Sequence, residues 1–316
     1  MSSAMGPPAK PPPKLTPKDL EHHNEYYDRI GRYKTTEEIE SEGKSIQSYW
    51  VEINEGRPYE WKRPPSKVQS RFTVLKEEGK ERKFPEYDDY WHTKLLDDLN
   101  QAGGVIRNIV AMDLGSLCYS EDHQFEIAAR AHLFAFNILK VLSDAANKSK
   151  ESGKGDPLRG AVFVCEDVRY GKYDLNFLHT DYLSDGREGW LSDRRIRPYT
   201  SNEGMGWWGT DGGNGDYIFI TLNPMNPIRQ YLARLLSKTE NLTDSERAAE
   251  KGILMGKLIK PRAIICRDAN KSGEYQDPTD PHVKDWFKKY YDQVHKFEDE
   301  KIFGGDIWLY TLKPNV

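Results

Sequence analysis

The chain has 316 residues, of which 30% are charged and 37% hydrophobic, and its formal net charge is −4 at pH 7. That length fits one large α/β domain, or a domain of about 200 residues with an added segment. No apolar run approaches the roughly 18 residues that a membrane-spanning helix needs, and the first residues lack the apolar stretch of a secretory signal. We therefore predict a soluble, cytoplasmic protein that does not bind membranes.

The cysteines and the overall charge narrow the function classes further. Metal-binding cysteines and disulfide frameworks show paired spacings, which are absent around the three cysteines, Cys118, Cys165 and Cys266. We therefore expect neither a disulfide framework nor a metal site, and no cofactor. The net negative charge argues against broad nonspecific nucleic-acid binding but leaves a local basic patch open.

Composition divides the chain into three parts. Residues 1–19 are rich in proline and lysine and predict a disordered tail. Residues 20–100 are highly charged, with helical patterns near 35–42 and 85–100, and predict an arm packed on the core. Residues 101–316 predict a Rossmann-like catalytic or ligand-binding domain.

The core begins with a strand from residue 108, a largely buried helix over 124–142 and a strand over 161–165, which together predict a right-handed βαβ unit. Residues 185–216 read as a long insertion without periodicity, typical of a lid or binding loop. Further strands are predicted over 217–222, 263–266 and 307–310, and further helices over 227–236, 244–258 and 281–294. The fold class is α/β: a Rossmann-like three-layer sandwich with a mostly parallel sheet of about five strands.

Ligands of a doubly wound sheet bind beyond the carboxyl ends of its strands. Each of the first four predicted core strands is followed at once by polar or turn-forming residues, so we place the site there. The candidates are Asp113, Gly115 and Ser116 after the first strand, Glu166 and Asp167 after the second, Asn223 and Asn226 after the third, and Asp268 after the fourth.

Ser116 is the central candidate. The glycine-rich phosphate-binding motifs and the G-x-S-x-G nucleophile elbow are both absent, which disfavours dinucleotide binding and a hydrolase of that class. Ser116 remains open to three roles: a structural turn or cap, a ligand contact, or a covalent nucleophile. His123 begins the next helix as a capping or surface residue, or as a base.

The acidic pair after the second strand, Glu166 and Asp167, also has alternative readings. Crowded carboxyls can transfer protons or bind a guanidinium group, whereas a solvated pair would only hold nearby loop amides. Tyr170 and Tyr173 follow closely enough to join the same pocket, or to pack in the core.

A basic and aromatic stretch lies inside the long insertion. Arg194, Arg195 and Arg197 occur with Tyr199 and two tryptophans, a mixture that can hold RNA phosphates and stack bases. The same pattern also fits an exposed loop fixed to the core by its tryptophans.

The order of these motifs resembles the sensitivity-to-red-light-reduced domain family over residues 108–270. The chain departs from that family at Val168, where members commonly carry proline after an aspartate. The runs that carry the resemblance are DLGSL at 113–117, VCED at 164–167, YD at 173–174, NPMNP at 223–227 and ICRD at 265–268.

More specifically, the chain resembles the fungal arginine-containing cyclodipeptide synthases of secondary metabolism. That resemblance implies an aminoacyltransferase in which Ser116 accepts an aminoacyl group from arginyl-tRNA, a second aminoacyl-tRNA extends it, and cyclisation releases a diketopiperazine. It further implies catalytic roles for Glu166, Asp167 and Tyr173, and tRNA contacts from the basic stretch. The alternative is a noncatalytic regulatory protein that binds a small molecule or a protein partner.

Overall fold

The structure is a computed structural model. The residues it describes are 36–44, 70–75, 77–78, 90–101, 106, 108–117, 122–151, 163–167, 170, 174, 177–178, 196–199, 217–222, 228–240, 260–270, 279–297 and 306–314. The predicted tail at 1–19 and the predicted helix at 244–258 lie outside these residues.

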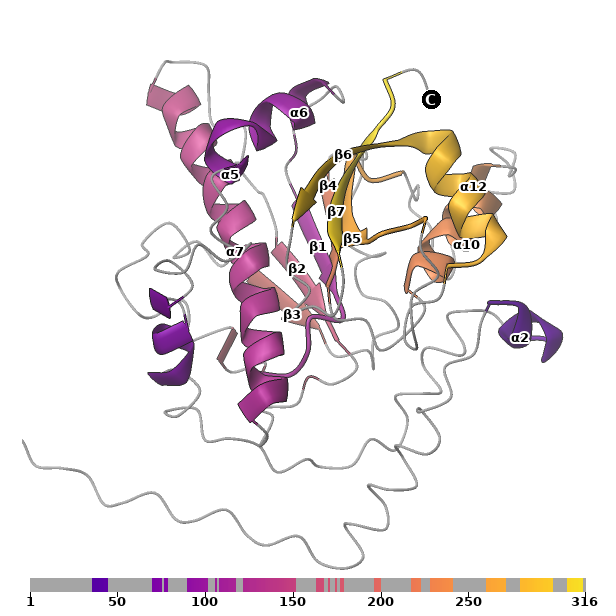
Figure 1. The fold of residues 1–316 in the computed structure, drawn as a ribbon, viewed down its shortest axis with the longest axis horizontal. Helices are drawn as coiled ribbons and strands as arrows, with labels where there is room; N and C mark the ends of the chain where they lie inside the picture. The colour runs from indigo at the N-terminus through magenta and orange to yellow at the C-terminus, as the bar shows by residue number, and fades with distance from the viewer. Residues whose placement is uncertain are drawn as a thin grey trace, which may run out of the picture.

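A seven-stranded sheet organises the described chain, in the order β3-β2-β1-β4-β5-β7-β6 (Figure 1). The first five strands in this order are parallel, and β7 runs antiparallel to both β5 and β6. The strands are β1 Asn108–Met112, β2 Phe163–Glu166, β3 Ile196–Tyr199, β4 Tyr217–Thr221, β5 Ala263–Arg267, β6 Tyr291–Phe297 and β7 Ile307–Leu312.

Helices cover both faces of the sheet, which produces three layers (Figure 1). One face packs against α7 with α5 and α6, and the other packs against α10 and α12 with α2. We call these the α7 face and the α10 face. The helices are α2 Thr36–Ser41, α5 Tyr90–Thr93, α6 Leu95–Gln101, α7 Asp122–Glu151, α10 Ile228–Glu240 and α12 Pro281–Tyr290.

Successive side chains of a strand point to opposite faces of the sheet, and this alternation produces one hydrophobic core on each face. Ile109 and Ala111 of β1 belong to the α7-face core, and Val110 and Met112 belong to the α10-face core. Strands buried on both faces read as continuous apolar runs, and β1 is buried from Ile109 to Met112. The prediction of a mostly parallel α/β sandwich is therefore confirmed.

The predicted number of about five strands is wrong, because two strands were missed. The helix predicted over 281–294 ends at Tyr290, and β6 follows directly from an extended Tyr291. The second missed strand, β3, lies inside the predicted insertion at 185–216 and pairs in parallel with β2. The helix predicted over 124–142 is longer than expected and runs from Asp122 to Glu151.

The segment before β1 contributes to both layers. Phe72 and Leu99 join the α7-face core, and Ile39 joins the α10-face core. Tyr90 of α5 stacks on His295 of β6, with ring centroids 3.7 Å apart and planes 3° apart, while its hydroxyl donates to Asp98 at 2.6 Å. Residues near the start of the described chain are thus fixed to strands near its end.

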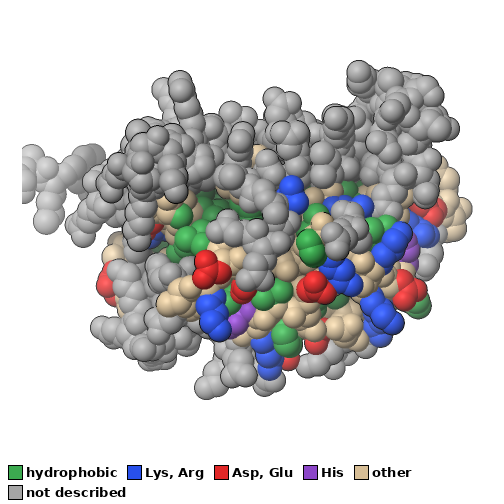
Figure 2. Space-filling view, turned by 90° about the horizontal axis from the view of Figure 1, so that it is seen from above, with side chains coloured by type: hydrophobic (Ala, Val, Ile, Leu, Met, Phe, Trp, Pro, Cys, Tyr) green, Lys and Arg blue, Asp and Glu red, His purple; other side chains and the backbone are tan. Residues whose placement is uncertain are grey.

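Basic side chains gather over the surface where α12 lies, at the right of Figure 2. Lys284, Lys288 and Lys289 of that helix are exposed, and the last two occupy its final turn. Positive charge there complements the helix dipole. No helix within the described part of the chain combines the length and apolar character needed to cross a bilayer.

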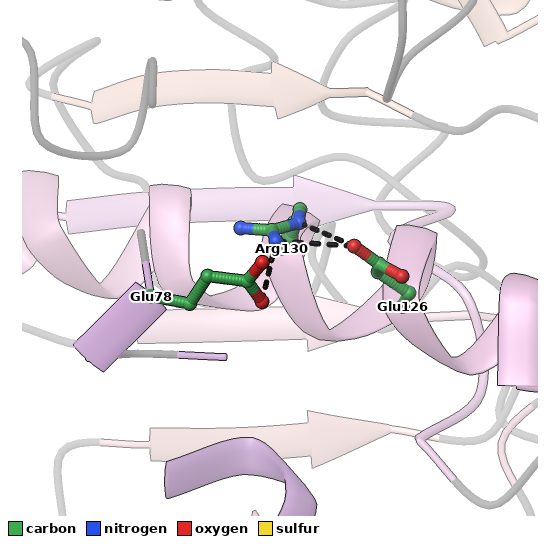
Figure 3. A network of polar contacts seen from close by, with 3 residues as sticks. All are labelled: Glu78, Glu126 and Arg130. Carbon is green, nitrogen blue, oxygen red and sulfur yellow. Dashed lines mark hydrogen bonds and ion pairs between the residues drawn. The ribbon is translucent and has the colours of Figure 1, made fainter. Parts of the chain in front are cut away.

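A buried arginine ties the segment before β1 to α7 (Figure 3). The Arg130 side chain is 1% exposed, and its Nη2 lies 3.0 Å from Glu126 Oε1 and 3.5 Å from Glu78 Oε2. A guanidinium is costly to bury unless carboxylates compensate its charge. The ion pair with Glu78 therefore links residues 77–78 to the long helix.

We expect Glu126→Gln to lower the free energy of unfolding by about 1 kcal/mol, because a buried cation loses one of its charged acceptors. Urea denaturation measures this change. The matched control is Asp144→Asn, which breaks an i,i+4 pair on the same helix whose two side chains are 42% and 43% exposed. That control should change stability by less than about 0.5 kcal/mol, and equal losses would contradict the prediction.

Candidate functional site

The candidate site begins at the turn after β1, at the lower edge of the sheet in Figure 1 where α7 also starts. Asp113 has φ 53° and Gly115 has φ 96°. An aspartate in the left-handed region carries strain of about 1 kcal/mol, and such strain persists only where the surroundings fix it. Residues 113–117 are all buried, and the Asp113 N–H donates to the carbonyl of Glu166 at 3.0 Å.

Two carboxylates hold this turn by its backbone. Gly115 N–H donates to Asp167 Oδ2 at 2.6 Å, and Leu117 N–H donates to Asp174 Oδ1 at 2.7 Å. Backbone amides in a turn of this kind commonly bind phosphate. Here these two amides bind the protein's own carboxylates, so the turn is not a phosphate cradle.

Ser116 lies between these two amides. Its hydroxyl is 3.0 Å from both carboxylate oxygens of Asp174, to one of which it donates. The side chain is fully buried. A hydroxyl within hydrogen-bond reach of a carboxylate has the arrangement of a nucleophile with a base, and equally that of a fixed structural turn.

A second polar group packs on the α7 face beside this pair. His132 of α7 lies 2.7 Å from the Ala128 carbonyl through Nδ1 and 2.7 Å from the Tyr170 hydroxyl through Nε2. Because a carbonyl only accepts, Nδ1 carries the hydrogen and the Tyr170 hydroxyl donates to Nε2. The backbone N–H of Tyr170 donates to the Asp167 carbonyl at 3.1 Å, which places this tyrosine beside the turn.

Burial and negative charge keep two neighbouring groups protonated. Burial raises the pKa of Tyr170 well above its ordinary value, and Cys165, Asp167 and Asp174 raise it further. Burial also raises the pKa of the Cys165 thiol, and the charges of Asp167 and Glu166 raise it further. Both groups are therefore neutral at physiological pH, and Cys165 is not a thiolate nucleophile.

Glu166 and Asp167 are adjacent in sequence, but their side chains lie on different faces of the sheet. Asp167 reaches the turn, as described above. Strand alternation places Glu166 with Val164 on the α10 face. There it lines up with Met112 of β1 and Thr221 of β4 across the sheet edge.

Negative charge is concentrated at this edge. The buried carboxylates among the described residues all belong to this region: Asp113, Glu166, Asp167 and Asp174. A charged group is costly to bury, and the carboxyl ends of parallel strands are where ligands of such sheets bind, so these acids mark the candidate site. In the described part of the chain no group of three or more His, Cys, Asp or Glu side chains is arranged to hold a metal ion.

The remaining predicted site residues have varied outcomes. Asp268 lies at the end of β5, where its Oδ1 accepts from Asn270 N–H at 2.9 Å. His123 is exposed on the first turn of α7. Arg197 pairs with Val164 through the β3 backbone. Outside the described residues lie Tyr173, Arg194, Arg195, Asn223 and Asn226.

Sequence reasoning did not single out three buried residues of this region: Asp174, His132 and Thr221. Asp174 is 58 residues from Ser116, and the only signal for it was its place in the YD pair. His132 lies within an apolar helical pattern that hides it. Thr221 reads as an ordinary strand residue.

Comparison with known proteins adds no assignment, because no protein-family model, curated protein or solved structure matches the chain.

We expect Asp174→Asn to lower the free energy of unfolding by about 2–3 kcal/mol, because the substitution weakens charge-assisted bonds from Ser116 and Leu117. Ser116→Ala removes only one of these bonds and should cost about 1 kcal/mol. Urea denaturation of both variants measures the two losses. The reverse order would mean that Asp174 does not hold the turn.

Stability should fall as pH rises above about 9, because the Cys165 thiol ionises in the unfolded chain while the folded state keeps it protonated. The raised pKa thus contributes stability that is fully present below pH 9 and is lost progressively above it. Urea denaturation across this range measures the slope, and Cys165→Ala should make it shallower. An unchanged slope in Cys165→Ala would contradict the assignment.

Proposed function

We propose that this chain is an aminoacyltransferase, a tRNA-dependent cyclodipeptide synthase that makes an arginine-containing diketopiperazine. The observation that carries the proposal is the Ser116 hydroxyl bonded to the Asp174 carboxylate. Ser116 lies on a strained turn at the carboxyl edge of the sheet, where α/β enzymes bind their ligands, and Asp174 reaches it from the chain that follows β2.

The reaction begins at Ser116. Its oxygen attacks the ester carbonyl of arginyl-tRNA while Asp174 takes the hydroxyl proton. The bond between the carbonyl carbon and the ribose oxygen breaks, and that oxygen leaves with the proton that Asp174 took from Ser116. The product of this step is arginyl-serine and free tRNA.

Two further steps complete the ring. The amino group of the arginyl-serine attacks the ester of a second aminoacyl-tRNA, which forms a peptide bond and releases the second tRNA. The new terminal amine then attacks the seryl ester. This attack closes the diketopiperazine and returns the Ser116 hydroxyl.

The acidic surroundings favour arginine as the first substrate. Asp113, Asp167 and Asp174 surround the turn with carboxylates, and the guanidinium of arginine pairs with carboxylates through parallel hydrogen bonds. Such pairing compensates the cost of removing the guanidinium from water. A neutral side chain gains nothing from that charge.

One role that the sequence assigned to other residues changes in this proposal, and one stays as assigned. The base is Asp174 rather than the acidic pair, since Asp174 is the carboxylate within reach of Ser116. In this proposal the basic stretch with Arg194, Arg195 and Arg197 binds the phosphate backbone of the tRNA. The second candidate function is noncatalytic ligand binding, favoured by the full burial of Ser116.

Expression in bacteria, which supply charged tRNAs, should release a diketopiperazine into the medium, with a mass shift when labelled arginine is fed. Mass spectrometry of the medium detects it. Ser116→Ala should abolish the product, and Asp174→Asn should lower it by about 100-fold or more, as expected for loss of a general base.

The matched control is Ser237→Ala, which changes a half-buried serine on α10 and should leave the yield unchanged. A folded wild-type protein that releases no new diketopiperazine would refute the synthase. Undiminished cellular function of Ser116→Ala would favour the noncatalytic candidate.

A further inference from the structure

A buried tyrosine lies between the two carboxylates that hold the turn after β1. Tyr170 comes three residues after Asp167 and four residues before Asp174, and it is 1% exposed. Burial raises the pKa of its phenol well above the usual range, and the charges of Asp167 and Asp174 raise it further. Charges that shift a pKa lie nearby, so the phenol is a neighbour of both carboxylates.

One side chain of α7 holds this phenol. The Tyr170 hydroxyl lies 2.7 Å from Nε2 of His132, whose Nδ1 lies 2.7 Å from the Ala128 carbonyl. His132 is fully buried. Its ring lies beside that of Phe136, with centroids 6.0 Å apart, and Phe136 packs on Phe163 of β2. The imidazole is therefore fixed in position and orientation by contacts with both α7 and β2.

The hydrophobic core holds the chain on the other side of Asp174. Phe177 comes three residues after Asp174, is buried in the α7-face core and packs on Phe72, with ring centroids 5.7 Å apart. Tyr170 and Phe177 thus anchor the chain before and after Asp174. Functional groups are held precisely when the residues around them are themselves locked by packing and hydrogen bonds, so the position of this carboxylate depends on both anchors.

The proposed reaction is sensitive to the position of this carboxylate. The Ser116 hydroxyl is 3.0 Å from both carboxylate oxygens of Asp174, and proton transfer requires the two groups to stay within about 2.6–3.2 Å of each other. A misplacement of about 1 Å can lower a rate by about 100-fold. A residue that fixes this distance therefore affects the chemical step without contacting the substrate.

We propose that His132 is a positioning residue: through the Tyr170 hydroxyl it holds the Asp174 carboxylate at the distance from Ser116 that proton transfer requires. Its effect on catalysis rests on the proposed function, whereas the placement of the carboxylate at the turn does not. The two parts of the proposal are therefore measured separately.

Two substitutions of His132 separate its bond to Tyr170 from its bond to Ala128. Glutamine places an amide oxygen near the position of Nε2 and keeps an acceptor for the Tyr170 hydroxyl, whereas asparagine places its amide near Nδ1 and keeps only the donor to the carbonyl. We expect His132→Asn to lower kcat for diketopiperazine formation by about 10-fold or more, with KM for arginyl-tRNA within about 2-fold of wild type. His132→Gln should keep kcat within about 3-fold of wild type.

Tyr170→Phe removes the same bond from the other side and should lower kcat as much as His132→Asn does. The double variant should be no worse than either single variant, because both break one interaction. The matched control is Tyr291→Phe, which removes a buried hydroxyl that donates to the Pro261 carbonyl at 3.0 Å, on the α10 face. That control should leave kcat unchanged. Equal kcat losses in His132→Asn and His132→Gln, or a lower kcat in Tyr291→Phe, would overturn the proposal.

Amide hydrogen exchange, followed by NMR on the full chain, tests the placement without any product. The Leu117 N–H donates to Asp174, and it should exchange about 5-fold faster in His132→Asn and Tyr170→Phe, the equivalent of one weakened hydrogen bond. In His132→Gln and Tyr291→Phe it should exchange at the wild-type rate. The amide of Ile265, a fully buried residue of β5, reports global unfolding and should not change.

The two proposals fail separately. A wild-type chain that makes no diketopiperazine refutes the synthase, and the exchange of Leu117 still decides whether His132 places the carboxylate. Unchanged Leu117 exchange in His132→Asn would overturn the positioning role even in a chain that makes the product.

Discussion

The candidate site depends on two carboxylates that accept hydrogen bonds from backbone amides. Asp167 and Asp174 accept from Gly115 and Leu117, and in doing so they fasten the turn after β1 to the chain that follows β2. The strained backbone at Asp113 persists because these bonds and the bond to the Glu166 carbonyl fix the turn on both sides. They also orient the Ser116 hydroxyl and concentrate negative charge in a water-excluded place.

This arrangement divides the chemistry of the sheet edge between its two faces. Ser116, Asp174 and Tyr170 lie with His132 of α7, whereas Glu166 and Thr221 lie toward α10. The polar groups at the sheet edge therefore form two neighbouring but separate sets.

Sequence patterns predicted the elements whose burial is uniform. β1, β2, β4 and β5 are apolar on both faces, so their runs were recognised without knowledge of the fold. β6 was missed because its residues are largely exposed between Tyr291 and Phe297, and α12 passes into it with no glycine or proline to mark the change. β3 was missed because its four residues, IRPY, carry no apolar run.

For the candidate site, sequence patterns identified the carboxyl edge of the sheet but not which side chains form hydrogen bonds with one another there. Ser116, Asp167 and Glu166 follow directly from the strand ends. Asp174 and His132 enter only through tertiary contacts with residues 58 and 38 positions away along the chain, at Ser116 and Tyr170. A pattern that spans a few residues carries no information on such contacts, so the hydrogen bond between Ser116 and Asp174 could not be predicted from it.

The stacking of Tyr90 on His295 has a consequence for how the protein is made. A ribosome releases the chain from its N-terminus, yet Tyr90 of α5 packs against aromatic rings of β6, those of His295 and Phe297, which are made much later. Glu78 likewise forms its ion pair with Arg130 only after α7 has been synthesised. The segment before β1 thus completes its packing only after nearly the whole chain has emerged, and until then its apolar side chains are exposed to chaperones, proteases and other nascent chains.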